Sequence, residues 1–273
     1  MLKQRVITAL VLLAFLLPAL FYPSPEPFCA LTLVMIVGAG WEWARLNGVH
    51  GLLAWGCGLA LGVLLGAIWW QVGLDVHIPW LWQAVALVWV LLTAWMLRRG
   101  VAGWAGVPRV PRLLVGLVLI GVAWWAMAQA RYMGVGMLLS MMLLVWMADI
   151  AAYFGGKAFG KRKLAPAISP GKSWEGAYSG GVGVLLLALG WLWLGSGDSL
   201  YARLWAMGPV LFLLGVVFLT CMSVAGDLIE SLVKRSAGVK DSSQLLPGHG
   251  GVLDRVDALL PVMPLAMMLV SYQ

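Results

Sequence analysis

The stretch SVAGDLIESLVKRSAGVKDSSQLLPGHGGVLDRVD, Ser223 to Asp257, decides how the rest of this chain is interpreted. The protein has 11 acidic residues in all. Five of them lie in this window: Asp227, Glu230, Asp241, Asp254 and Asp257. Basic side chains lie among them: Lys234, Arg235, Lys240, His249 and Arg255. Charges gathered so densely in one segment of an apolar chain indicate a functional site.

The first part of this window, 223–236, follows an apolar run at 209–220. The polar residues of this first part recur at helical spacing. At 100° per residue, Ser223, Asp227, Glu230 and Lys234 fall at about 0°, 40°, −20° and 20° around a helix. The spacing therefore predicts a helix that carries one polar stripe.

The second part of the window, PGHGG at 247–251, cannot form a regular helix, because proline lacks an amide donor and glycine favours tight turns. Asp254 and Asp257 follow one turn apart, at the start of another apolar run. Two carboxylate-bearing helix ends joined by a basic, glycine-rich loop predict a site for a divalent metal and phosphate. The alternative is a solvated loop in which the acids cap helices.

The composition is that of an integral membrane protein. Of the 273 residues, 62% are hydrophobic and 11% are charged, with a mean hydropathy of +0.93, whereas soluble domains carry about 25% charged residues. We therefore predict an all-α fold, a polytopic bundle of about nine transmembrane helices, each near the ~20 residues that a bilayer requires. The predicted spans are Val6–Tyr22, Phe28–Leu46, Leu52–Trp70, Trp80–Leu97, Leu113–Ala130, Met133–Phe154, Ala177–Leu194, Leu204–Val224 and Val256–Val270.

The basic residues predict the orientation of the bundle. With the N-terminus in the cytoplasm, these spans leave only Arg131 and Arg203 outside, as the positive-inside rule prefers. We predict a scaffold of about five spans in residues 1–130, and a catalytic region in 131–273 with cytoplasmic loops 155–176 and 231–255. The short chain favours a bacterial inner membrane, with the site facing the cytoplasm. Glu42 and Arg45, three residues apart at a helix end, are expected to pair locally.

A second group of candidate residues precedes the window. Asp149 lies deep in an apolar span, where a carboxylate is costly, with Tyr153 one turn further on; a helix–helix hydrogen bond is the competing explanation. The following basic loop has glycines that let backbone N–H groups approach phosphate. It lacks the GxxxxGKS or GxxxxGKT spacing of a P-loop. Lys172 and Ser173 stand at a predicted helix N-terminus, which favours anions.

The run SLVKRSAGVKDSSQLLPGHGGVLDRVD, Ser231 to Asp257, resembles the signature of the phosphatidate cytidylyltransferases, also called CDP-diacylglycerol synthases. The order Asp149, Tyr153, Gly156, Gly160, Lys161 and then ISPGKSWEG is similar to the same family upstream of its signature. The resemblance covers about 149–257. It implies an enzyme of phospholipid biosynthesis that converts phosphatidate and CTP to CDP-diacylglycerol and pyrophosphate with Mg²⁺. It also suggests a homodimer. No motif for nucleic-acid binding is found in the sequence.

On this interpretation each candidate residue has a hypothetical role. Asp227 and Asp254 are the expected principal ligands of one or two Mg²⁺ ions, with Asp149 and Glu230 as additional or outer ligands. The remaining catalytic candidates, which hold or protonate phosphate oxygens, are His249, Lys234 and Arg235. The candidates for substrate binding are Lys172, Ser173, Lys240, Arg255, Gly250 and Gly251. Asp241 and Asp257 are expected to orient neighbouring basic groups.

Two other classes of membrane protein share some of these features. A CDP-alcohol phosphatidyltransferase also uses magnesium and a CDP-lipid, but its DGxxAR motif is missing from this sequence. A membrane transporter that uses intramembrane carboxylates would explain Asp149 and Asp227, and it remains the alternative.

Overall fold

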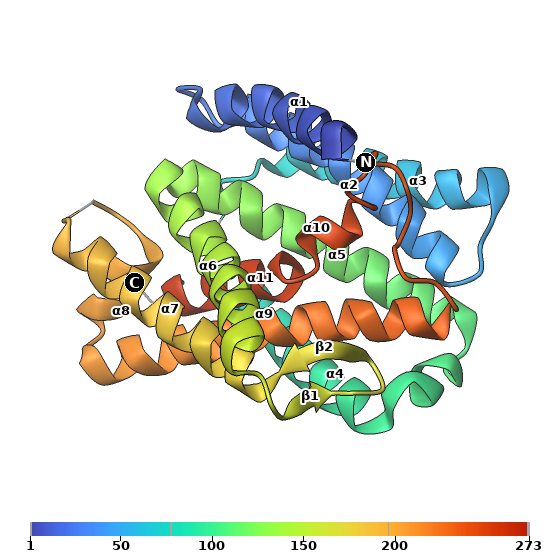
Figure 1. The fold of residues 1–273 in the computed structure, drawn as a ribbon. Coiled ribbons are helices and arrows are strands. Elements are labelled where there is room, and N and C mark those ends of the chain that lie inside the picture. The colour runs from blue at the N-terminus through green and yellow to red at the C-terminus, as the bar shows by residue number, and fades with distance from the viewer. Residues whose placement is uncertain (1, 77, 196, 272–273) are drawn as a thin grey trace.

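The computed structural model describes residues 2–76, 78–195 and 197–271, and it is a bundle of helices with one small hairpin (Figure 1). The helices are α1 (Leu2–Phe21), α2 (Glu26–Leu46), α3 (Gly51–Val72), α4 (Pro79–Ala105), α5 (Arg109–Met133), α6 (Val135–Phe159), α7 (Trp174–Trp193), α8 (Leu200–Ala206), α9 (Pro209–Ser236), α10 (Leu253–Val256) and α11 (Leu259–Val270). The strands are β1 (Lys163–Ala165) and β2 (Ser169–Ser173).

The prediction of an all-α bundle is confirmed. In the described part of the chain, eight helices are long and apolar enough to cross a membrane: α1 to α7 and α9. The predicted eighth span differs at both ends. It begins at Pro209, after the separate short helix α8, and continues to Ser236, because the polar stripe of the window lies on the same helix as the apolar run.

The predicted ninth span is a shorter element than expected. Its helix, α11, has 12 residues, which at 1.5 Å per residue extends about 18 Å, short of the roughly 30 Å of a hydrocarbon core. Most of its residues are buried, so the run is apolar because it forms protein core.

The helix α11 packs against α9 in the opposite direction. A Cβ atom on Gly226 would lie 2.7 Å from the Asp257 carbonyl oxygen and 3.0 Å from the Ala258 Cα, so the backbones touch at this crossing. A Cβ atom on Gly215, nearer the start of α9, would face Leu269 at 3.6 Å. The loop after α9 therefore leads back to the level of Gly226, and α11 then runs along α9 towards Gly215. Figure 1 shows α11 among the other helices.

The hairpin β1–β2 connects α6 to α7. Its strands are antiparallel, with Lys163 paired with Ser173 and Ala165 with Ser169. The loop predicted at 155–176 is thus shorter, because α6 continues to Phe159 and α7 begins at Trp174. The hairpin presents Lys172 towards the C-terminal half of α9.

One hydrophobic core takes residues from both halves of the sequence, among them Trp82, Trp124, Met141 and Leu228. The N-terminal end of α1 is tied to the window, because the Thr8 hydroxyl donates to the Pro247 carbonyl at 2.9 Å. Many apolar side chains on the outer helices are exposed, as expected for helices that face lipid. The division into a scaffold, 1–130, and a catalytic region, 131–273, remains a prediction.

Candidate active site

An open cavity of about 490 Å³ lies between α6, the hairpin, α7 and α9. Its walls include Asp149 and Tyr153 from α6, Lys172 and Ser173 from β2, and Asp227 from α9. The structure thus brings together predicted site residues that the sequence separates by up to 78 positions (227 − 149). Asp149 is no isolated helix–helix contact, since it faces a space that could hold a ligand.

A basic side chain from the hairpin reaches the carboxylate of α9 inside this cavity. The Lys172 Nζ atom lies 2.6 Å from Asp227 Oδ2, and both side chains are partly exposed. The other Asp227 oxygen accepts a hydrogen bond from the Ser231 hydroxyl at 3.2 Å. Asp227 therefore already attracts a cation, and Lys172 can exchange this partner for an anionic ligand.

The N-terminus of α7 opens into the same cavity. The Ser173 Oγ atom caps the helix by accepting from the Gly176 N–H at 3.2 Å, and both residues line the cavity. A Cβ atom on Gly176 would lie 2.9 Å from the Ala152 carbonyl oxygen, so glycine lets α6 and α7 pack closely here. The start of a 20-residue helix carries partial positive charge, which favours phosphate at this wall.

A second polar group is buried beside α9 and α10. Lys234 forms ion pairs with Glu230, one turn earlier on α9, and with Asp254 Oδ1 at 2.6 Å. The second Asp254 oxygen accepts from the Ser242 N–H at 3.0 Å and from the Gly251 N–H at 2.8 Å, and it lies 3.0 Å from the Ser242 hydroxyl oxygen. Both oxygens of Asp254 are therefore engaged by donors of the protein itself. We call Glu230, Lys234, Ser242 and Asp254 the buried charge cluster.

The surroundings of Asp254 favour its charged form. Burial alone would raise its pKa, but the Lys234 ion pair and the N–H groups of Gly251 and Ser242 outweigh it and hold the pKa below its usual value. Asp254 is thus a carboxylate at neutral pH, where it fixes the loop to α9.

The structure contradicts the expected pairing of Glu42 with Arg45. Glu42 is completely buried and accepts hydrogen bonds from the Ser242 and Ser243 hydroxyls and from the backbone N–H groups of Val252 and Leu253. The Arg45 guanidinium lies over the Trp41 ring instead, 4.7 Å from its centroid. Sequence reasoning therefore missed a residue that contacts the window. The signal was present, since Glu42 is an acid within an apolar span, as Asp149 is.

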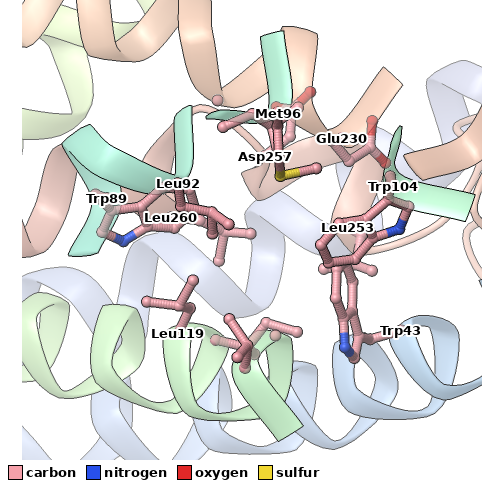
Figure 2. A pocket seen from close by; sticks show the side chains of 15 residues that line it. Trp43, Trp89, Leu92, Met96, Trp104, Leu119, Glu230, Leu253, Asp257 and Leu260 are labelled. Atoms are coloured by element: carbon pink, nitrogen blue, oxygen red, sulfur yellow. The ribbon is translucent and has the colours of Figure 1, made fainter. Parts of the chain in front are cut away.

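A small apolar pocket of about 40 Å³ lies against the acidic residues of α9 and α10–α11. Figure 2 shows Glu230 and Asp257 at one edge, near Met96, with Trp43 and Trp89 along the wall. Asp257 is close enough to interact electrostatically with Glu230 and also with Asp227. Asp257 therefore lies near acidic residues of both the buried charge cluster and the open cavity. Its expected role in orienting basic groups remains a prediction.

The remaining predicted residues lie outside the open cavity. Lys240 and Asp241 line a second opening of about 730 Å³, with Arg45 and His50. Arg235 donates to the Val239 carbonyl at 3.2 Å, and Arg255 donates to the carbonyl of His249. Gly250 and Gly251 are required by the buried charge cluster, since a Cβ atom on Gly250 would lie 2.7 Å from Asp254 Oδ2.

The carboxylates form two groups, not one. Asp149 and Asp227 line the open cavity, whereas Glu230 and Asp254 share Lys234. Within the described ranges, no three His, Cys, Asp or Glu side chains lie close enough together to hold a metal ion by themselves. The two carboxylates of the cavity offer oxygen donors of the kind that Mg²⁺ prefers, with room for water and phosphate oxygens.

Known proteins are similar to this chain over almost its whole length. Residues 3–273 match the model of the cytidylyltransferase family. The phosphatidate cytidylyltransferase of Pseudomonas aeruginosa is 44% identical, over 97% of this chain and 95% of the relative. That of Haemophilus influenzae is 39% identical over 97% and 96%, and that of Brucella suis 35% over 95% and 89%. The similarity extends beyond 149–257, to the N-terminal spans.

Proposed function

This chain belongs to the cytidylyltransferase family, and on that premise we propose that it transfers the cytidylyl group of CTP to phosphatidate in the membrane. The transporter alternative has no support, because the relatives compared above are phosphatidate cytidylyltransferases by name. The observation that carries the proposal is the open cavity, in which Lys172 and the start of α7 offer positive charge opposite Asp149 and Asp227.

The reaction requires positioning more than strong acid–base catalysis. A phosphate oxygen of phosphatidate attacks the α-phosphorus of CTP, a new P–O bond forms, and the bond to the leaving pyrophosphate breaks. The nucleophile is already an anion, so the main barrier is repulsion between phosphates and their alignment. Cationic groups and helix-end N–H donors reduce this repulsion. Lys172, Lys157 and the α7 N-terminus line one cavity and are suited to this role.

Magnesium fits the donor set of the cavity. Asp149 and Asp227 would hold it, and Lys172 on Asp227 marks where a positive charge is favoured. When bound, Mg²⁺ neutralises the triphosphate and favours departure of pyrophosphate. We propose Asp227 and Asp149 as direct ligands. Because Asp254 and Glu230 are already paired with Lys234, we propose that they support the metal site through the position of α9 and α10.

The remaining assignments rest on the same premise. We propose an inner-membrane enzyme whose cavity faces the cytoplasm. This orientation agrees with the excess of basic residues predicted on the cytoplasmic side. We also propose that the enzyme acts as a homodimer. CTP and phosphatidate are its substrates. Four further basic residues lie outside the cavity and are retained as candidates for contacts with the lipid phosphate: Arg235, Lys240, His249 and Arg255.

The test is transfer of label from α-phosphate-labelled CTP into a solvent-extractable lipid by the purified protein in detergent, with phosphatidate and with or without Mg²⁺. Magnesium-dependent label in the lipid is expected, together with its loss in Asp227→Asn. Absence of transfer by folded protein across several acyl chains would overturn the proposal. Substrate uptake into sealed vesicles without a labelled lipid product would then favour transport.

A further inference from the structure

The geometry points to Glu42 as a positioning residue for this reaction. We propose that Glu42, on α2 in the predicted scaffold, fixes the loop 242–252 and the start of α10, and thereby sets the positions of Asp254 and Lys234. This inference rests on the proposed function. It assigns to the N-terminal half a direct part in organising the active site.

The first observation is the number of donors that converge on Glu42. Its Oε1 atom accepts from the Ser243 hydroxyl at 2.6 Å and from the Val252 N–H at 2.9 Å. Its Oε2 atom accepts from the Ser242 hydroxyl at 3.0 Å and from the Leu253 N–H at 2.8 Å. All four donors belong to a segment about 200 positions away in sequence. One side chain therefore holds both ends of the loop.

The second observation is that Glu42 supplies the cap that α10 lacks. Val252, at the N-cap of α10, makes no side-chain cap hydrogen bond, and an uncapped helix start leaves its first N–H groups without partners. Glu42 accepts from the N–H groups of Val252 and Leu253. Asp254 is the next residue, so the position of its carboxylate follows from this contact.

The third observation is a shared partner. The Ser242 hydroxyl lies 3.0 Å from Glu42 Oε2 and 3.0 Å from Asp254 Oδ2, and Asp254 in turn binds Lys234 at 2.6 Å. A chain of contacts therefore runs from α2 through the loop to α9, which carries Asp227 about two turns before Lys234.

The fourth observation concerns the space around the carboxylate. A Cβ atom on Gly251 would lie 2.5 Å from Glu42 Oε1 and 2.0 Å from the Ser242 Oγ atom. Glycine at this position therefore leaves room for the loop to close on Glu42. Because Glu42 is fully buried, water cannot replace it as the acceptor for these donors, and its loss would release the loop.

The test compares Glu42→Gln with Thr32→Val, a control on the same helix. Thr32 is also buried, donates to the Phe28 carbonyl and accepts from the Trp124 indole N–H, away from the loop. In Glu42→Gln an amide nitrogen, which cannot accept a hydrogen bond, replaces one carboxylate oxygen, so two of the four contacts are lost without a change in size. Both variants are purified in detergent, and only monodisperse protein is assayed, with its thermal unfolding midpoint recorded.

We expect Glu42→Gln to lower kcat about 10- to 100-fold, because misplacement by about 1 Å has effects of this size. KM for CTP should change much less, since the cavity that holds Lys172 is intact. Glu42→Asp, which keeps all acceptors, should recover part of the rate. Thr32→Val should lower the unfolding midpoint as much as Glu42→Gln does, yet keep its kcat. A purely structural role for Glu42 would not separate these two variants.

A second variant makes the contact itself testable. Ser243→Ala removes one donor to Glu42 and should lower kcat in the wild-type background, but have little further effect when Glu42→Gln is present. The inference is overturned if Glu42→Gln keeps kcat within about twofold, or if the two substitutions act independently. Failure of the wild-type protein to transfer label would instead overturn the proposed function, so the two failures are distinguishable.

Discussion

Lys172 is held in position by the opposite charge of Asp227. Lys172 comes from a two-stranded hairpin, yet its ammonium group lies 2.6 Å from Asp227 on α9. An ion pair at the mouth of an open cavity is readily exchanged for other partners, because both groups remain partly solvated. We therefore propose that Lys172 exchanges Asp227 for the phosphate groups of CTP and of the pyrophosphate product.

We predict that Lys172→Gln lowers kcat about 100-fold, as removal of a donor to a developing phosphate charge does in other enzymes. Lys172→Arg should recover part of the loss. Arg99→Gln removes one positive charge from an exposed position on α4 that does not line the cavity, and it should keep near-normal activity. Label transfer from CTP at saturating phosphatidate measures all three. Equal activities of Lys172→Gln and Arg99→Gln would exclude a specific role for Lys172.

Asp254 gives a prediction that depends on pH. Its pKa in the folded protein is below the value of about 3.9 for an unfolded chain, so folding favours its deprotonated form. Its contribution to stability is therefore fully present above about pH 3.9 and is lost as the pH falls through the folded-state pKa. Asp254→Asn should cost about 1–3 kcal/mol at pH 7.

The measurement is the thermal unfolding midpoint of the wild type and Asp254→Asn in detergent. The wild type should be more stable at pH 7, and the difference should shrink towards about pH 3, where the carboxylate becomes protonated. A difference that stays constant over this range would show that the charge of Asp254 does not contribute.

At the scale of the elements, close helix crossings place the acidic residues. The crossing of α9 with α11 has no room for a side chain at Gly226, where a Cβ atom would meet the Asp257 carbonyl oxygen and the Ala258 Cα. Small residues permit such close packing between helices in membranes. Asp227 follows Gly226 directly, so the crossing also sets the distance between Asp227 and Asp257.

Gly226→Ala should therefore destabilise the protein by about 1–3 kcal/mol, as overpacking does in well-packed cores, and should lower kcat by separating α9 from α11. Gly181→Ala is the matched control, because a Cβ atom there, on α7, would have open space around it. Thermal unfolding midpoints and label transfer report the two effects. If both alanine variants behave alike, the crossing does not control the site.

The sequence predicted these elements to different extents. Hydropathy located the eight long helices. The helical spacing of Asp227, Glu230 and Lys234 correctly predicted that these residues lie on one helix. The length of α11 was overestimated, because an apolar run looks the same whether it faces lipid or protein. The predicted pairing of Glu42 with Arg45 was wrong, because helical spacing relates only residues of the same helix. Its partners, near Ser242, are brought to it only by the packing of α2.

At the scale of the whole molecule, the functional segments meet at one end of the bundle. The start of α1 contacts the window through Thr8 and Pro247, and the end of α2 contacts it through Glu42. The hairpin reaches the C-terminal half of α9 through Lys172. Segments from the N-terminal half thus contact the window, and the hairpin contacts α9 beside the cavity. The placement of the site relative to the membrane therefore depends on the orientation of the entire bundle.

This orientation is testable with single cysteines. The variants Gln244→Cys, in the window, and Gln71→Cys, near the other end of α3, place exposed thiols at opposite ends of the bundle. The native Cys29, Cys57 and Cys221 are first replaced by alanine. With the site in the cytoplasm, a membrane-impermeant maleimide should label Gln71→Cys in intact cells, and Gln244→Cys only in inverted vesicles. The reverse pattern would place the site outside, where CTP is absent, and would contradict both the charge distribution and the proposed function.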